Sequence, residues 1–424
     1  MTAIPSATEA PVITDSRQLV ETFAAGCKPV DAWRTGTEHE KFVVDVHGRP
    51  GSYETAIRPL LERLAARHGW EPVLENGQPI ALKRGRAAIS LEPGGQFELS
   101  GAPLATLHET ADELDSHFAE AESIARELGL EFLIQGVHPA WRREDMPWMP
   151  KGRYAIMRRY MPLKGSLGLD MMLRTCTVQA NLDFSSERDM IEKFRLSLAL
   201  QPLATALFAN SRNLEGRDTG YASWRARIWT DTDPDRCGVP GFVFENGMGF
   251  ERYADWALDV PMYFVYRQGR YVDAAGQSFR DFLEGRLPAL PGERPTLADW
   301  QDHLTTLFPD VRLKTYLEMR GADAGSRPML LALPAFWTGL LYSASASAAA
   351  WDEVKGWPVE ALRQLRLDAA RQGLDASLPG RGSLRDLAKI ILPLARAGLQ
   401  ERARLDSKGQ DESQYLDALA AFVR

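Results

Sequence analysis

The chain has 424 residues, of which 45% are hydrophobic and 25% are charged, and its 50 lysines and arginines against 57 aspartates and glutamates give a net charge of −7. This composition is that of a soluble globular protein, and it excludes a disordered, collagen-like or coiled-coil chain. The net negative charge argues against a dedicated nucleic-acid or anionic-membrane surface, so we expect no nucleic-acid and no membrane partner.

The three cysteines are Cys27, Cys176 and Cys237, which are widely spaced and include no Cys-x-x-Cys pair. The sequence therefore indicates neither a disulfide framework nor a zinc site, and free thiols are typical of a reducing compartment. The first 18 residues contain neither the basic segment nor the apolar segment of a secretory signal. We predict a cytoplasmic protein.

The first third of the chain is predicted to mix helices and strands. We expect a loose tail over residues 1–14, followed by a single domain over residues 15–424. A helix is indicated over 103–128, because apolar residues recur there every three or four positions between an initial proline and a final glycine. The other predicted elements are a helix at 16–25, strands at 35–46, 87–91, 96–100 and 130–137, and a turn at Asn76-Gly77.

The predicted strand at 35–46 separates two kinds of side chain. Alternation along a strand places Glu38 and Glu40 on one face, and His39 and Lys41 on the other. The carboxylate face is a candidate for binding chemistry, whereas His39 is interpreted as structural.

Residues 138–170 show little periodicity and are rich in proline, glycine, tryptophan, methionine and basic residues. Long irregular segments of this kind often form substrate loops or lids. Two interpretations stay open, a solvated loop and an anion-binding lid. The basic residues considered for such a lid are Lys151, Arg153, Arg158, Arg159 and Lys164.

The remainder of the chain continues with both kinds of element. Residues 174–184 and 311–320 alternate as strands, a helix is expected from Ser186 to about residue 208, and the last hundred residues look largely helical. This pattern predicts an α+β fold with a mainly antiparallel sheet. The uncharged stretch 329–351 is long enough to cross a bilayer, but its proline, glycine and serines favour a buried helical hairpin.

Four predicted strands carry carboxylates or amides on one face. Clustered carboxylates raise one another's pKa unless a cation lies among them, and oxygen ligands suit Mg²⁺, Mn²⁺ or Ca²⁺. We infer a sheet face that binds a divalent metal and a phosphorylated ligand, while a solvated face with cross-strand ion pairs stays open as the alternative. The residues concerned are Glu38 and Glu40, then Gln96 and Glu98, then Gln179, Asn181 and Asp183, and last Glu318 and Arg320.

The usual nucleotide-binding motifs do not occur in the sequence. The chain has no Gly-Lys dipeptide and therefore no P-loop, and neither 247–252 nor 380–385 completes a GxGxxG motif. If ATP binds, a fold of another kind must bind it.

Several multi-residue strings resemble the plant-type glutamate–cysteine ligases, in the order in which that family has them. The resemblance runs from about residue 15 into the C-terminal helices, and a set of ordered motifs is more specific than any one motif. The strings are TGTEHEKF (35–42), SLEPGGQFELSG (90–101), MMLRTCTVQANLDF (171–184), IWTDTDPDRC (228–237) and TYLEMRGAD (315–323).

The resemblance implies a glutamine-synthetase-like carboxylate–amine ligase fold, in which a curved, mainly antiparallel sheet forms a funnel flanked by helices. It also implies ATP-dependent joining of the γ-carboxyl of L-glutamate to the amine of L-cysteine, the first step of glutathione synthesis. A carboxylate is a poor acyl donor, so the expected route passes through γ-glutamyl phosphate. ATP would be a co-substrate and Mg²⁺, or Mn²⁺, the cofactor.

The resemblance implies roles for the residues of this chain that match the family's motifs. The candidate metal ligands are Glu38, Glu40, Glu92, Glu98 and Glu318, and Arg320 is the candidate catalytic residue, facing the transferring phosphate or an acyl oxygen. The candidate substrate-binding residues are Gln96, Gln179, Asn181 and Arg236, with Arg174 and Arg227 as further candidates.

Three other hypotheses remain open at this point. A ligase of the same fold could join glutamate to a different amine, because only the pocket for the amine would change. A metal-dependent phosphohydrolase could use the same carboxylates and would release phosphate without an amine. A non-catalytic metal or nucleotide binder would show binding without turnover. The sequence does not predict an oligomeric state.

Overall fold

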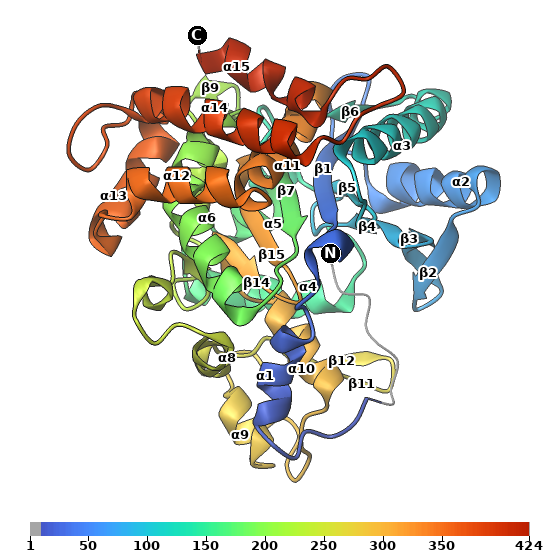
Figure 1. The fold of residues 1–424 in the computed structure, drawn as a ribbon. Helices are drawn as coiled ribbons and strands as arrows, with labels where there is room; N and C mark the ends of the chain where they lie inside the picture. The colour runs from blue at the N-terminus through green and yellow to red at the C-terminus, as the bar shows by residue number, and fades with distance from the viewer. Residues whose placement is uncertain (1–9, 424) are drawn as a thin grey trace.

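The computed structural model describes residues 10–423, and a nine-stranded sheet lies at its centre (Figure 1). The strand order is β14-β15-β7-β1-β5-β4-β3-β2, and β6 pairs with the end of β1. Every pairing in this sheet is antiparallel. The strands of the sheet are β1 (Thr35–Asp45), β2 (Glu71–Glu75), β3 (Gln78–Arg84), β4 (Ala87–Leu91), β5 (Phe97–Ser100), β6 (Leu130–Leu133), β7 (Thr177–Leu182), β14 (Val311–Leu313) and β15 (Leu317–Asp323).

Three short two-stranded ladders lie outside the main sheet. Two are antiparallel and one, β10 with β13, is parallel. Their strands are β8 (Asn213–Leu214) with β9 (Arg217–Asp218), β10 (Cys237–Gly238) with β13 (Phe308–Pro309), and β11 (Phe264–Arg267) with β12 (Arg270–Asp273).

Strand β1 lies within the sheet and is buried on both faces. Its register places Glu38 opposite Gln179 of β7, and Glu40 opposite Glu98 of β5. Directly paired residues point to the same face of a sheet. The predicted alternation is confirmed, because Glu38 and Glu40 line one cavity whereas His39 lines another on the opposite face.

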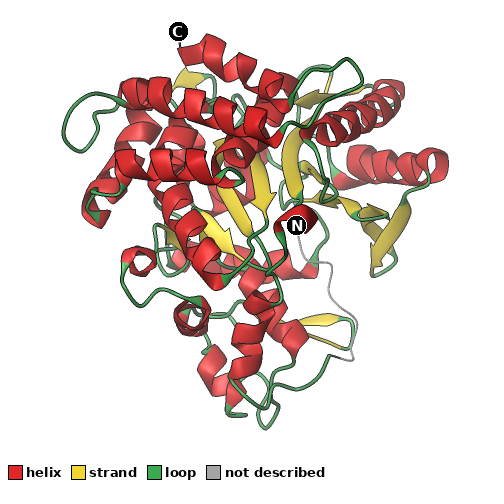
Figure 2. Cartoon of the chain, viewed as in Figure 1, coloured by secondary structure: helices red, strands yellow, loops and turns green. Residues whose placement is uncertain are grey.

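Helices cover the sheet and form most of the C-terminal part of the chain (Figure 2). Ser186 accepts the backbone N–H of Asp189 at the start of α6, where the sequence predicts a helix to begin. Helix α3 begins at Leu107, later than the predicted 103, because Thr106 caps it in a capping box with Glu109. The helices are α1 (Arg17–Ala24), α2 (Arg58–His68), α3 (Leu107–Glu127), α4 (Gly152–Tyr160), α5 (Gly168–Arg174), α6 (Glu187–Leu207), α7 (Trp224–Trp229), α8 (Phe250–Asp259), α9 (Phe279–Leu283), α10 (Leu297–Thr305), α11 (Arg327–Leu341), α12 (Ala344–Val354), α13 (Val359–Gln372), α14 (Leu384–Arg402) and α15 (Asp417–Val423).

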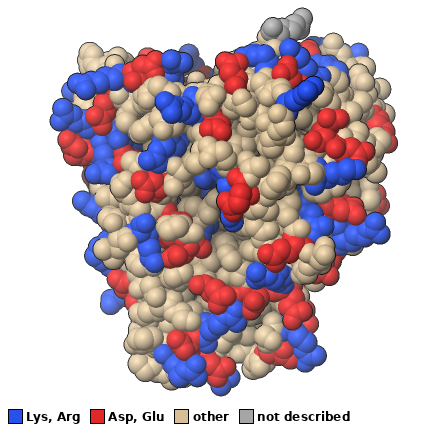
Figure 3. Space-filling view, turned by 90° about the vertical axis from the view of Figure 1, so that its left-hand side faces the viewer, with Lys and Arg blue, Asp and Glu red and all other residues tan. Residues whose placement is uncertain are grey.

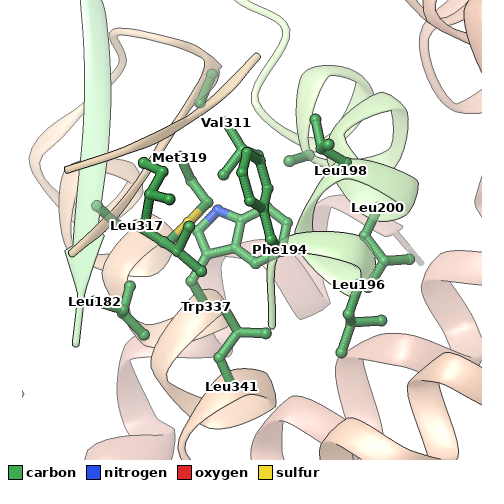
Figure 4. Close-up of a cluster of buried hydrophobic side chains, with 14 of the residues drawn as sticks. Leu182, Phe194, Leu196, Leu198, Leu200, Val311, Leu317, Met319, Trp337 and Leu341 are labelled. Atoms are coloured by element: carbon green, nitrogen blue, oxygen red, sulfur yellow. The ribbon is translucent and has the colours of Figure 1, made fainter. Parts of the chain in front are cut away.

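The larger hydrophobic core lies where α6 and α11 pack on β7 and β15 (Figure 4). Trp337 of α11 is fully buried there, close to Phe194 of α6 and Met319 of β15. Residues that alternate with the apolar side chains of β7 and β15 stand on the other face of the sheet. The core therefore fixes the strands that present Gln179 and Arg320 to the opposite side.

Helices α11 and α14 cross so closely that only glycine fits at the contact. A Cβ at Gly398 would overlap the carbonyl oxygen of Gly339, and a Cβ at Gly339 would overlap the carbonyl oxygen of Ala395. Both clashes are with backbone atoms, which cannot rotate away as a side chain can.

We expect Gly398→Ala to lower the free energy of unfolding by about 1–3 kcal/mol, the usual cost of overpacking a core. Urea denaturation followed by circular dichroism measures the change. Gly247→Ala is the matched control, because no heavy atom lies within 4 Å of a Cβ added there. Equal stability of the two variants would show that the helices separate at no cost and would refute this account.

No single helix among residues 10–423 is both long and apolar enough to cross a bilayer. The uncharged stretch forms the expected pair of helices, α11 and α12, and the two helices are bent by 92° at their junction. Only the two together have the length and the apolar composition of a membrane span. Most of α11 is buried in the protein.

Residues 311–320 do not form the single strand predicted from their alternation. They fold into the hairpin β14–β15, and the N–H of Lys314 donates to the carbonyl of Tyr316 in the turn at 2.8 Å. Arg312 consequently lies directly opposite Glu318. The alternation continues through the turn, so the sequence pattern alone does not reveal the break.

Two further predictions need correction. The irregular segment 138–170 contains α4 and the start of α5, and the buried face of α4 includes the charged residue Arg153, so its apolar periodicity is weak in the sequence. The loose tail predicted over 1–14 is attached in part, because Ile13 donates to the carbonyl of Pro295 at 2.8 Å and Val12 bridges Thr296. Residues 1–9 of that tail lie outside the described residues, and the single domain stays a prediction.

Basic and acidic side chains are interspersed on the face of the molecule drawn in Figure 3. Exposed ion pairs of the protein include Arg280 with Asp255 and with Asp259, each at 2.7 Å. Nucleic-acid binding uses an extended basic surface, and the face in Figure 3 carries no continuous patch of one sign. The expected lack of nucleic-acid and membrane partners remains a prediction.

Candidate active site

A pocket opens on the sheet face that carries Glu38 and Glu40, and it encloses about 780 Å³ including its open mouth. Strands of the main sheet form its floor, and helices α4, α5 and α7 supply much of its wall. Glu38, Glu40 and Glu98 lie on β1 and β5 and Glu92 follows β4, and we call this group the acidic wall. Arg312 and Arg320 lie on β14 and β15, beyond β7, and we call them the basic or arginine wall. The polar lining residues include Glu38, Glu40, Glu92, Gln96, Glu98 and Gln179, together with Arg153, Arg225, Arg312 and Arg320.

The acidic wall is a cluster of buried carboxylates. Burial raises the pKa of Glu40 well above its usual range, and the neighbouring charges of Glu92 and Glu98 raise it further. The carboxylate of Glu40 accepts the backbone N–H of Thr177 at 3.0 Å. A cation placed among these groups would relieve their repulsion, which is the condition that a divalent metal satisfies.

Hydroxyl and amide groups orient two of the carboxylates. Ser90 and Ser100 donate to Glu98 at 2.6 and 3.0 Å, one to each carboxylate oxygen. Asn181 donates its side-chain amide to Glu38 at 2.7 Å. Asn181 is not among the residues that line the pocket. Its side chain therefore orients Glu38 and is not placed to contact a substrate directly.

Gln96 lines the pocket but uses its side chain within the protein. Its carbonyl oxygen accepts the N–H of Gly94 at 2.8 Å, and its amide donates to the carbonyls of Met172 and Thr175 at 3.2 and 2.9 Å. These bonds hold the loop between β4 and β5, which carries Glu92, against α5. The structure thus supports a positioning role for Gln96.

Glu318, predicted as a metal ligand, lies behind the pocket wall among three cations. Arg312 donates to both its oxygens at 2.6 and 2.9 Å, Lys314 lies 3.2 Å away, and Arg320 also pairs with it. Burial alone would raise the pKa of Glu318, but these three cations hold it well below the usual range. Its carboxylate therefore orients the arginines of the basic wall.

Arg320 joins the basic wall to the amide side of the pocket. It lines the pocket and donates to the side-chain oxygen of Gln179 at 2.8 Å. The prediction that Arg320 and Gln179 share one funnel agrees with this placement, whereas their roles in the reaction remain to be tested.

Two arginines of the pocket, Arg225 and Arg312, were not singled out from the sequence, and a third, Arg153, was considered only as one basic residue of a possible anion-binding lid. Arg225 is 3% exposed, and Arg153 packs over the ring of Phe264 at 5.0 Å. Arg312 could have been found, since it shares the alternating face of Glu318 and Arg320. Arg225 carries no pattern that distinguishes it from neighbouring arginines, and Arg153 is one basic residue among several in its segment.

The structure does not bring three other predicted arginines to the pocket lining. Arg236 is fully buried, where it bonds Asp233 at 2.6 Å and lies over the ring of Tyr263 at 3.9 Å. Such a guanidinium is already saturated by its own ion pair and cannot reach a substrate carboxylate without breaking it.

The other two arginines are likewise bonded to side chains of the protein. Arg174 pairs with Asp170 and, at 2.7 Å, with Glu215. Arg227 donates to Thr230 at 2.8 Å and lies 3.9 Å from Asp231. The structure therefore gives Arg174, Arg227 and Arg236 structural contacts in place of the expected substrate contacts.

Within residues 10–423, no group of three or more histidine, cysteine or acidic side chains is placed to hold a metal ion by itself. Mg²⁺ nevertheless uses only one or two carboxylates and completes its octahedron with water and phosphate oxygens. The acidic wall offers carboxylate oxygens as donors, and such donors fit this ion.

An antiparallel sheet flanked by helices, with one polar pocket on its face, is the fold expected of a glutamine-synthetase-type carboxylate–amine ligase. In fold, the chain is similar to the crystal structure of glutamate–cysteine ligase from Francisella tularensis in complex with AMP, with a TM-score of 0.52 and 14% identity over 93% of this chain and 82% of that one. Residues 34–424 match the glutamate–cysteine ligase family 2 (GCS2). The chain belongs to this family.

Plant relatives match the chain over its whole length. The chain is 53% identical to the chloroplastic glutamate–cysteine ligase of Medicago truncatula, covering 100% of this chain and 82% of the relative, and 54% identical to that of Brassica juncea, covering 100% and 81%. The predicted family, fold and ligase are confirmed.

The cytoplasmic location predicted from the sequence is wrong by the same comparison. The relatives from Medicago truncatula, Brassica juncea and Arabidopsis thaliana are all named as chloroplastic enzymes. Scarce cysteines indicate the redox state of a compartment, but many compartments share that state, so the composition could not specify which one.

Proposed function

We propose that this pocket joins the γ-carboxyl of L-glutamate to the amine of L-cysteine at the expense of ATP, in the first step of glutathione synthesis. The observation that carries the proposal is that carboxylates and arginines line one pocket, with Gln179 between Glu38 of β1 and Arg320 of β15. A carboxylate wall suits the metal-bound phosphates of ATP, and an arginine wall suits the carboxylate and phosphoryl oxygens that react.

In the first step, an oxygen of the glutamate γ-carboxylate attacks the γ-phosphorus of ATP, and the bond between that phosphorus and the leaving ADP oxygen breaks. Glu38, Glu40, Glu92 and Glu98 would hold Mg²⁺ or Mn²⁺, which, when bound, neutralises phosphate charge. Arg320, fixed by Glu318 and Gln179, covers oxygen charge from the other side.

In the second step, the cysteine nitrogen attacks the carbonyl carbon of γ-glutamyl phosphate. The bond from that carbon to the phosphate oxygen breaks, the amine loses one proton, and phosphate leaves. The arginine wall stabilises the charge that develops on the carbonyl oxygen. Water must be excluded, because it would hydrolyse the acyl phosphate.

We expect the purified protein to release ADP from ATP, Mg²⁺ and L-glutamate only when L-cysteine is added. A coupled assay for ADP measures the rate, and mass spectrometry identifies γ-glutamylcysteine as the product. Phosphate release that does not depend on cysteine would indicate a phosphohydrolase instead. A faster reaction with another amine would refute the choice of cysteine and leave a ligase of the same fold.

A further inference from the structure

A second, smaller hollow lies beside the active-site pocket and shares four wall residues with it, Arg225, Trp229, Phe308 and Arg320. It encloses about 380 Å³ including its mouth. Its remaining walls come from α6, α7, β13, β15 and α13. The two hollows are thus neighbours across one partition.

The partition consists of side chains rather than of a continuous strand or helix. The rings of Trp229 and Phe308 meet edge to face with their centroids 5.8 Å apart. The guanidinium of Arg225 lies 5.9 Å from the centroid of the Trp229 ring and that of Arg320 lies 6.0 Å from it. Side chains change rotamer without unfolding the backbone, so a partition of this kind can open.

Two hydrogen-bond donors in this partition are unused. The Nε of Arg225 and the indole N–H of Trp229 are buried and have no hydrogen-bond partner among the described residues. The carboxylate closest to Arg225, that of Asp323, lies 4.0 Å away and already accepts hydrogen bonds from Ser211 and Ser223 at 2.6 and 2.8 Å. Buried donors without partners are costly, and an oxyanion would satisfy them.

A further arginine, Arg366, lines the smaller hollow. Arg366 lies on α13 and lines this hollow but not the active-site pocket. It bonds Asp310 at 2.6 Å. Three arginines therefore surround the hollow, while its lining contains a single carboxylate, that of Asp310. Each of these arginines already has a carboxylate nearby, so what the hollow offers a small anion is its N–H donors, among them the unused Nε of Arg225 and indole N–H of Trp229.

We propose that this hollow binds the inorganic phosphate that the reaction frees and lets it leave the active site past Trp229. The inference rests on the proposed function, because that reaction produces phosphate beside Arg320. Arg320 belongs to both hollows, so phosphate can pass from the arginines of the active site to Arg225 and Arg366 without losing charged donors. Several N–H groups around one space suit the oxygens of phosphate.

Two variants test the proposal without touching the active-site pocket. Arg366→Gln removes a cation from the hollow, and Ala226→Leu fills it, since Ala226 lines this hollow and not the other. Arg371→Gln is the control for charge, because Arg371 is exposed on the same helix. Thermal unfolding establishes that each variant is folded.

The readouts are product inhibition by inorganic phosphate and the order of product release. We expect Arg366→Gln to raise the inhibition constant of phosphate roughly tenfold, the loss expected for one charge-assisted hydrogen bond, with the KM values unchanged. We expect Ala226→Leu to form one equivalent of γ-glutamylcysteine rapidly and then to turn over slowly, with phosphate release at the slow rate. Arg371→Gln should match the wild type.

Two results would overturn the phosphate assignment. One is unchanged phosphate inhibition and unchanged release in both variants. The other is a raised KM for L-glutamate or L-cysteine with phosphate inhibition unchanged, which would make the hollow a site for a substrate carboxylate. Calorimetric titration of inorganic phosphate into the full chain with ADP and Mg²⁺ tests the hollow even if the ligase assay fails, so the two proposals can fail separately.

Discussion

Replacing Glu40 with glutamine is expected to lower kcat by about two to three orders of magnitude, the loss that follows when several kcal/mol of metal-mediated charge stabilisation disappear. The glutamine side chain can still accept the N–H of Thr177, which Glu40 accepts at 3.0 Å. It also removes one charge from a crowded cluster, so the fold should survive. Cysteine-dependent ADP release at saturating Mg²⁺, together with thermal unfolding, measures both effects.

Glu113→Gln is the matched control for Glu40→Gln. Glu113 is a partly buried carboxylate on α3 that accepts the N–H of Ala102 at 2.9 Å, and it lines the cavity on the opposite face of the sheet. Burial raises its pKa, as it does for Glu40. We expect near wild-type activity from this control. Near-normal activity of Glu40→Gln at saturating Mg²⁺ would refute the role of Glu40 as a metal ligand.

Arg320→Lys should lower kcat by about a hundredfold or more, because lysine cannot reproduce the planar fork of donors that arginine presents. The guanidinium of Arg320 bonds Gln179 at 2.8 Å and pairs with Glu318 while it lines the pocket. Lysine keeps a positive charge next to the buried carboxylate of Glu318, so the ion pair is retained and the protein should fold. Steady-state kinetics and thermal unfolding measure the outcome.

Arg371→Lys, on the exposed surface of α13, controls for the substitution itself. An Arg320→Lys variant with full activity would mean that a point charge suffices at this position. A variant that loses activity together with its folded structure would instead give Arg320 a structural role.

The sequence predicts the acidic half of the site well, because a strand alternates with a fixed period. That period put Glu38 and Glu40 on one face and His39 on the other, and the structure confirms it. Glu98 follows from the same alternation, Glu92 follows from motif resemblance alone, and both line the same pocket. Local periodicity needs no knowledge of distant parts of the chain, which is why it succeeds here.

The basic half was predicted less well, because periodicity does not show which carboxylate or carbonyl an arginine will bond. Arg236 looked like a ligand for a substrate, yet its carboxylate partner, Asp233, lies three residues earlier in the same motif. Arg225 reaches the pocket through contacts with β15, about a hundred residues further on. The turn at 314–316 contains none of the glycine, proline or asparagine residues that mark turns, so the hairpin stayed hidden.

The two walls of the pocket come from separate stretches of the chain. The carboxylates lie between residues 38 and 98, the arginines lie between residues 153 and 320, and the pairing of Glu38 with Gln179 joins the two stretches. During synthesis the acidic stretch leaves the ribosome first, with its carboxylates not yet faced by their counter-charges. Neither stretch alone can bring phosphate and carboxylate together. Catalytic activity is therefore a direct measure of the fraction of molecules in which the first and last parts of the sheet have met.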